Sequence, residues 1–469
     1  MSRIRTLGVL GAAAVAAVVT VVAAPPANAD DLSSGSWYYQ ALHVQEALDA
    51  GFTGKGVKIA VIDTQINPAI PTLQGANLTP VDKTYCYDAQ GKPIPPTSTD
   101  YAAAMHGTHV ASLIVGTGEA EPGQVPIRGV APQAEVLFYN SGIAAAPDSS
   151  LTCLDAKGEN RPVESLAEAM NDAMDAHADI ISVSQGVPYS GALNRALARA
   201  LALGIPVVAG LTNDALSTTG GYPGVGNGSV GVQAIDATGA VQKADGFSNR
   251  SLSVKVAAPG VGIITQGTSE SWDAQELGSG TSLATPIVAG FLADMKSKFP
   301  SATGNQLLQT MIRNTGGTLH DPRWGNDLGY GTISLTQMRE DNPLAYEDVN
   351  PFFDPKASQS QGPTVDDVGA AKGAEALKPT AGTQTTTPQA GKPAADGASA
   401  GTPAWVPFAI GGGVLLLIVV GGVFAVVMGT RRRRGAEPAQ AVDKPASDGE
   451  HHMHAPTGAG SGADQGGRG

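Results

Sequence analysis

Several residue types are scarce in this chain of 469 residues. Two cysteines are too few for a four-cysteine zinc site or a disulfide-dense scaffold. Basic residues are also few, with 29 Lys and Arg against 42 Asp and Glu, which gives a net charge of −13. Because binding to phosphates needs a basic surface, this balance excludes nucleic acid as the main partner. Aromatic residues make up only 5% of the chain and charged residues only 15%.

Glycine and proline, by contrast, are abundant. With 60 Gly and 32 Pro, part of the chain is expected to be loop or linker. The apolar fraction of 42% is still enough for a large core, and the length allows two or three domains.

The N-terminal residues 1–29 have the pattern of a signal peptide. Two arginines, Arg3 and Arg5, precede an apolar run, and Ala27-Asn28-Ala29 offers small residues at a cleavage point. The alternative is an uncleaved membrane anchor.

A second apolar run, from Val406 to Met428, predicts a transmembrane helix over residues 405–429, since about 23 residues at about 1.5 Å each span roughly 34 Å. Trp405 lies at one end and Arg431 to Arg434 lie at the other, so the positive-inside rule places residues 430–469 in the cytoplasm as a disordered tail. The preceding part of the chain is then expected outside the cell. In that location Cys86 and Cys153 are predicted to form a disulfide, the alternative being two free thiols.

Residues 30–345 are predicted to form an α/β domain. Short apolar runs at 58–62, 136–139, 180–183 and 205–209 read as buried strands, and they alternate with helical spacing at 166–177 and 193–201. This alternation favours a mainly parallel sheet between layers of helices. Residues 346–404 are rich in Pro, Ala, Gly and Thr, above all after Lys356, and are predicted to be a disordered tether.

Three segments contain the residue types of nucleophilic catalysis. They are Val61-Ile62-Asp63-Thr64, the run from His106 to Ser112 (HGTHVAS), and the run from Gly280 to Pro286 (GTSLATP). A serine becomes nucleophilic when a histidine takes its proton, and a buried carboxylate orients the imidazole and stabilises its cation. The chain order Asp, His, Ser is one of the known orders of such a triad.

These three segments resemble the signature blocks of the subtilisin-like serine proteases, the subtilases, over roughly residues 50 to 335. The resemblance implies a subtilisin-like three-layer fold, with Asp63 as orienting acid, His106 as base and Ser282 as nucleophile. His109, the second histidine of its block, is then expected to be structural. The family's oxyanion asparagine is matched by Asn213, although Thr212 stands where the family usually has Gly. Gln65 likewise replaces a usual Gly.

The resemblance also implies a substrate site. Ser184, Gln185 and Gly186 resemble the edge segment that pairs with the substrate backbone, Gly221 with Tyr222 and Pro223 resembles the floor of the primary specificity pocket, and Gly210 is expected on the pocket wall. Two glycines leave room, so a large apolar side chain is the predicted preference.

The layout of signal peptide, protease domain, tether and single span resembles one branch of the family, the mycosins of type VII secretion machines. The expected activity is that of a membrane-anchored extracytoplasmic serine endopeptidase acting on polypeptides, with secretion-machine membrane components as partners if the chain belongs to that branch. The alternative is a structural subunit of such a complex, in which the protease fold is a binding surface. No cofactor is required by this chemistry. Calcium is common in the family, but the sequence offers no recognisable ligand set and no metal site is assigned.

Overall fold

The structure, a computed structural model, describes residues 32–144, 151–213, 221–244, 247–248 and 252–378. The predicted signal peptide, transmembrane helix and cytoplasmic tail lie outside these residues. Within the described ranges, no helix is both long enough and apolar enough to cross a membrane.

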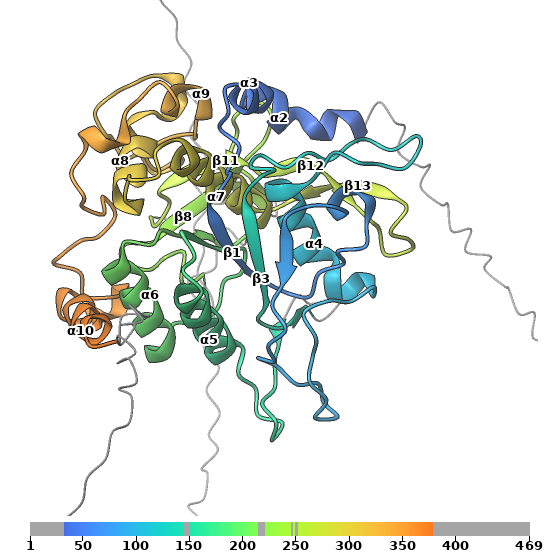
Figure 1. The fold of residues 1–469 in the computed structure, drawn as a ribbon, viewed down its shortest axis with the longest axis horizontal. Coiled ribbons are helices and arrows are strands. Elements are labelled where there is room, and N and C mark those ends of the chain that lie inside the picture. The colour runs from blue at the N-terminus through green and yellow to red at the C-terminus, as the bar shows by residue number, and fades with distance from the viewer. Residues whose placement is uncertain (1–31, 145–150, 214–220, 245–246, 249–251, 379–469) are drawn as a thin grey trace, which may run out of the picture. The chain divides into compact units, whose positions relative to one another are not determined.

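A seven-stranded parallel sheet is the centre of the domain (Figure 1). Its strand order is β11-β8-β7-β6-β1-β3-β2, and every neighbouring pair runs parallel. The strands are β1 (Lys58–Asp63), β2 (Leu78–Pro80), β3 (Glu135–Asn140), β6 (Ile180–Val183), β7 (Val207–Gly210), β8 (Val230–Ile235) and β11 (Val256–Pro259). The predicted α/β class with a mainly parallel sheet is confirmed.

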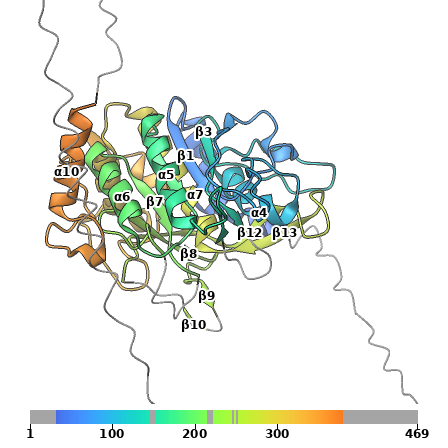
Figure 2. The same cartoon turned by 90° about the horizontal axis from the view of Figure 1, so that it is seen from below.

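Helices cover both faces of the sheet, as Figure 2 shows from below. Helices α4 (Tyr101–Val115) and α7 (Thr281–Lys298) pack on one face, and α5 (Pro162–Asp175) and α6 (Gly191–Leu203) pack on the other. Side chains alternate between the two faces along β1: Ile59 and Val61 belong to the core under α4 and α7, whereas Ala60 and Ile62 belong to the core under α5 and α6. A strand buried on both faces needs an unbroken apolar run, which is the pattern that the sequence shows.

The remaining elements surround this centre. They are the helices α2 (Trp37–Ala41), α3 (Val44–Asp49), α8 (Gly304–Arg313), α9 (Leu335–Met338) and α10 (Val365–Ala376), the antiparallel pair β12 (Val261–Gln266) and β13 (Gln275–Ser279), and the two-residue pairs β4 (Ile143–Ala144) with β5 (Leu151–Thr152) and β9 (Lys243–Ala244) with β10 (Phe247–Ser248).

The prediction that a disordered tether begins at residue 346 is wrong, because residues 346–378 are part of the folded domain. They follow the surface of the domain and end in α10, which packs against α6 (Figure 2). Phe352 is buried, and Arg199 of α6 forms an ion pair with Glu375 of α10. The segment has little apolar surface, but hydrogen bonds and ion pairs to the domain order it. Any tether can therefore begin only after residue 378.

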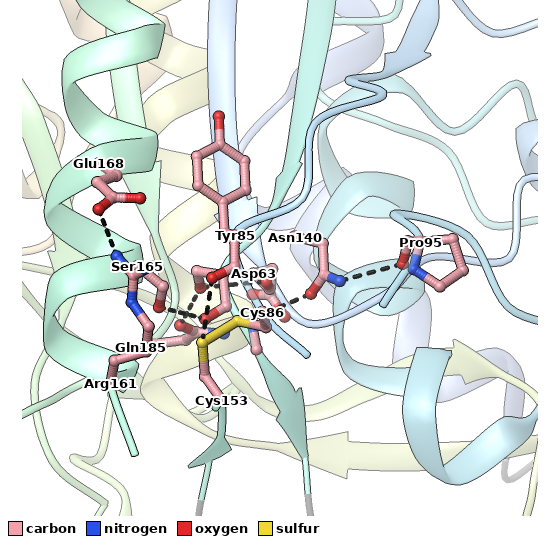
Figure 3. Close-up of a disulfide and its surroundings, with 12 residues drawn as sticks. Asp63, Tyr85, Cys86, Pro95, Asn140, Cys153, Arg161, Ser165, Glu168 and Gln185 are labelled. Carbon is pink, nitrogen blue, oxygen red and sulfur yellow. Dashed lines mark hydrogen bonds and ion pairs between the residues drawn. A yellow bond between two sulfur atoms is a disulfide. The ribbon is translucent and has the colours of Figure 1, made fainter. Parts of the chain in front are cut away.

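A disulfide joins Cys86 to Cys153, and both residues are fully buried (Figure 3). It fastens the loop before Pro95 to the chain that leads into α5. The carbonyl of Pro95 accepts hydrogen bonds from the side chains of Gln65, two residues beyond the end of β1, and Asn140, at the end of β3. The cross-linked loop is thus attached to the carboxyl ends of two central strands.

Replacing both cysteines with serine should lower the free energy of unfolding by about 4 kcal/mol, because the bridge spans 67 residues and restricts the unfolded chain. Urea unfolding followed by circular dichroism measures this loss. The reduced wild type is the control and should unfold at the same urea concentration as the double variant. Equal stability of the double variant and the oxidised wild type would contradict the structure.

Candidate active site

Asp63 is the last residue of β1 and is completely buried. Its Oδ1 accepts hydrogen bonds from the backbone N–H of Thr64 at 2.7 Å, the hydroxyl of Thr64 at 3.2 Å, and Nδ1 of His106 at 2.7 Å. A buried carboxylate is costly unless donors surround it. Thr64 and His106 supply donors to Oδ1, whereas the buried Oδ2 has no hydrogen-bond partner among the described residues. The carboxylate lies at the carboxyl edge of the sheet, where parallel α/β folds place their ligand sites.

His106 lies in α4, which begins after Asp100, whose side chain caps the helix by accepting from the N–H of Ala103. The next residue, Gly107, allows the helix to approach β1 closely. A Cβ added to Gly107 would lie 2.6 Å from the carbonyl oxygen of Gln65 and 2.6 Å from the ring of Phe138. The glycine of the His-Gly pair therefore brings the imidazole into contact with Asp63.

Two opposing effects act on the pKa of His106. Burial alone would lower it, but the negative charge of Asp63 and its hydrogen bond outweigh burial and raise the pKa above 6.5. The imidazole is still 28% exposed, so its other face can meet a ligand.

His109, one turn further along α4, is buried and its Nε2 contacts the carbonyl oxygen of Gln266 at 2.8 Å. Burial lowers its pKa to about 4, so it is neutral at neutral pH. The expectation of a structural His109 agrees with this placement.

Ser282 lies in the first turn of α7. This turn lies beside Asn213 at the carboxyl edge of the sheet. The Oδ1 of Asn213 accepts from the backbone N–H of Thr281 at 2.9 Å, which directs its Nδ2 away from Thr281. A Cβ added to Gly280 would lie 3.0 Å from Oγ of Ser282 and 3.5 Å from Nδ2 of Asn213. The hydroxyl and the amide therefore border one space, which the glycine keeps open.

The Ser282 hydroxyl has no hydrogen-bond partner among the residues that the structure describes. Hydrogen bonds between nucleophile and base are often long in enzymes without substrate and shorten when it binds.

The predicted edge segment lies next to this centre. The hydroxyl of Ser184 donates to the carbonyl oxygen of Ser282 at 2.9 Å. The side chain of Gln185 is buried and accepts from the hydroxyl of Ser141 at 2.8 Å, and the same hydroxyl donates to the carbonyl oxygen of Asp63 at 3.2 Å. Gly186 faces Gly221: a Cβ on Gly186 would lie 2.8 Å from Cα of Gly221. Since the side chains of Ser184 and Gln185 bond within the domain and Gly186 has none, the backbone of this segment is the part that can pair with an extended peptide.

Gly210, which the resemblance places on the pocket wall, is the last residue of β7. A Cβ added to it would meet the hydroxyls of Thr281 and Thr285 of α7 at 3.1 and 3.2 Å, so its open side faces the helix. The methyl of Thr212 lies 3.2 Å from the Cβ position of Gly221, so Thr212 borders the residue expected at the pocket floor.

No group of three or more His, Cys, Asp or Glu side chains suited to holding a metal ion occurs in the described residues.

A family model described as the subtilase family matches residues 54–331. Fervidolysin of Fervidobacterium pennivorans is 29% identical over 325 residues, and a thermostable alkaline protease of Halalkalibacterium halodurans is 31% identical over 296 residues. These alignments cover 65% and 62% of this chain, and 44% and 71% of the two relatives. The crystal structure of fervidolysin superposes with a TM-score of 0.50 and 25% identity, over 65% of this chain and 46% of that one.

The chain thus spans less than half the length of fervidolysin, and 42% of the minor extracellular protease Epr of Bacillus subtilis.

Replacing Asp63 with Asn should lower the pKa of His106 below 6.5, because burial would then act without an opposing charge. In the wild type the Asp63–His106 pair contributes stability below pH 6.5, and this contribution is lost as the pH rises through the raised pKa. NMR titration of the imidazole measures the shift.

A matched control is Asp179→Asn, since Asp179 accepts from the backbone N–H of Lys58 at the other end of β1. This variant should leave the His106 titration unchanged. An unchanged titration in Asp63→Asn would contradict the assigned contact.

Proposed function

Because the chain belongs to the subtilase family, we propose that it is a serine endopeptidase acting on polypeptides, with Asp63, His106 and Ser282 as its catalytic triad. The observation that supports this most is the 2.7 Å contact between Asp63 and His106 at the sheet edge where the helix bearing Ser282 begins. A buried carboxylate that raises the pKa of a partly exposed histidine prepares that histidine to accept a proton.

In the proposed reaction, Oγ of Ser282 attacks the carbonyl carbon of the peptide bond while Nε2 of His106 takes the hydroxyl proton. Asp63 holds the proton of Nδ1, which fixes the tautomer that leaves Nε2 free as acceptor. The same carboxylate stabilises the imidazolium that forms.

In this reaction, negative charge develops on the carbonyl oxygen of the substrate, and we expect that oxygen to lie in the space beside Gly280. There the Nδ2 of Asn213 and the backbone N–H of Ser282 are its donors, and the N-terminus of α7 adds favourable potential. Donors held in place before reaction matter most: losing one typically lowers turnover by about 100- to 1,000-fold.

The tetrahedral intermediate then breaks its C–N bond, and the imidazolium of His106 gives its proton to the leaving amine. The acyl group stays on Ser282. A water molecule, deprotonated by His106 in the same way, attacks the ester, and the returning proton restores the serine hydroxyl and releases the acid.

We place this activity outside the cell on a membrane anchor. The support is the apolar run 405–429 with Arg431 to Arg434 behind it, the leader pattern of residues 1–29, and the buried Cys86–Cys153 disulfide, which persists in oxidising compartments. Processing of secreted proteins within a type VII-like machine is the role that this layout favours.

A fluorophosphonate probe should label the wild type and not Ser282→Ala, because only a serine activated by a base reacts at a useful rate. Gel fluorescence measures the labelling. Ser334→Ala is the matched control, since the hydroxyl of Ser334 caps α9 and the variant should keep full labelling.

Absence of label on a folded wild type would argue against the protease. A Ser282→Ala strain with normal secretion and no accumulated precursor would instead favour the structural role.

Replacing Thr212 with Gly should shift the preferred side chain before the cut toward larger apolar residues, since it removes the methyl beside Gly221. A change of about tenfold in the ratio of kcat/KM for Phe and Ala substrates is expected. Kinetics on a matched peptide series measures it, with Thr238→Gly in a remote turn as control. An unchanged ratio would mean that Thr212 does not line the pocket.

A further inference from the structure

We propose that the C-terminal strap, residues 350–378, positions the pocket loop, residues 221–228, and that Asn227 is the positioning residue that joins them. The proposal deepens the function proposed above, because the pocket loop begins with the predicted floor of the specificity pocket, Gly221 and Tyr222. The family match ends at residue 331, so the strap is a part of this chain beyond the shared domain.

Backbone groups of the pocket loop are bound directly by the strap. The N–H of Asn227 donates to the carbonyl oxygen of Gln361 at 2.9 Å, and the N–H of Gly228 donates to that of Phe352 at 3.2 Å. The carbonyl oxygen of Gly228 accepts from Nδ2 of Asn350 at 2.9 Å. The strap thus satisfies polar groups that the loop, a turn without strand partners there, leaves open.

The side chain of Asn227 reaches two separate points of the strap. Its Nδ2 donates to the carbonyl oxygens of Asp354 at 3.0 Å and Pro363 at 2.9 Å, while its Oδ1 accepts from the N–H of Asp354 at 2.8 Å. Between these points Gly362 approaches closely: it has φ 129°, and a Cβ there would lie 2.5 Å from the backbone nitrogen of Asn227. The fit therefore depends on the asparagine of the loop and the glycine of the strap together.

A second connection runs through α6 to the other end of the loop. The hydroxyl of Tyr222 donates to Oδ1 of Asn194 at 2.9 Å, and Nδ2 of Asn194 contacts Oδ2 of Asp367 at 3.4 Å. Tyr222 and Asn194 are almost completely buried, so water is excluded from the hydrogen bond between them. Asp367 is itself fixed by the capping box with Thr364 that begins α10.

The strap is itself held on the domain by a buried aromatic side chain and by ion pairs. Phe352 is buried and its ring centroid lies 5.8 Å from that of Tyr330. Arg199 of α6 contacts Glu375 at 2.6 Å and Asp175 at 2.5 Å, and Lys378 contacts Asp175 at 3.0 Å. Figure 2 shows α10 beside α6.

On its other side the pocket loop meets the predicted edge segment. Val187 and Tyr222 exchange backbone hydrogen bonds at 3.0 and 3.1 Å, and Gly186 packs on Gly221. The pocket floor is thus held between the segment that pairs with substrate and the strap. Loss of the strap contacts should let the floor move without disturbing Asp63, His106 or Ser282.

The test is Asn227→Ala in the full chain, with Asn305→Ala as matched control. Asn305 donates to Oδ1 of Asp348 at 2.9 Å, two residues before the strap begins, and this hydrogen bond does not involve the pocket loop. Asn227→Ala should raise KM for peptides by about tenfold, leave kcat within about twofold, and leave fluorophosphonate labelling unchanged. Hydrogen–deuterium exchange of residues 221–228 should become faster. Asn305→Ala should change none of these.

A parallel fall in kcat and labelling, or equal effects of both variants, would overturn the proposal. If Asn227→Ala does not fold, Tyr222→Phe is the deciding variant, since it removes only the hydroxyl that bonds Asn194. It should raise KM and speed up hydrogen–deuterium exchange of residues 221–228. No change in either quantity would contradict the proposal. A wild type that neither labels nor cleaves would refute the protease function alone, because the exchange measurement still tests whether the strap holds the loop.

Discussion

The arrangement of the site depends on one buried carboxylate at the end of a central strand. Asp63 has no access to solvent, so its charge has to be balanced by nearby donors. Thr64 supplies two from the adjacent backbone and hydroxyl, and His106 supplies the third from a helix 43 positions away in sequence. This requirement fixes the approach of α4 to β1 and explains why only glycine fits at 107.

A parallel sheet makes such a meeting possible between segments far apart in the chain. The carboxyl ends of β1, β6 and β7 lie next to one another, so the residues that follow them, Thr64, Ser184 and Leu211, start from one edge. Helix α7 brings Ser282 to the same edge, and its first turn bonds Asn213 through Thr281 and Ser184 through Ser282. Gly107 permits a backbone contact that any side chain would block, and Gly280 leaves open the space between the Ser282 hydroxyl and the Asn213 amide.

Most of this could be predicted from sequence, and the exceptions have physical causes. The strands at 58–63 and 180–183 are mostly apolar, with an unbroken apolar run at 59–62, and the three motif segments locate Asp63, His106 and Ser282 beside one sheet edge. The closeness of Thr212 to Gly221 could not be predicted, because it depends on how a later segment of the chain packs back on the end of β7, and the motif does not fix that. Residues 346–378 were missed because apolar content is a poor guide to a segment ordered by ion pairs and backbone hydrogen bonds, such as those of Arg199 and Asn227.

The strap shows why the boundary of a family and the boundary of a folded unit need not coincide. A turn such as residues 221–228 lies outside the strands, so its backbone groups need partners from elsewhere. Here the partners come from a segment after residue 331 that has few large apolar side chains of its own and is ordered by the same hydrogen bonds. Loop and strap therefore stabilise each other, and a chain cut at the family boundary would leave the carbonyl of Gly228 and the amide of Asn227 to water. The shape of the pocket is then a property of the longer unit.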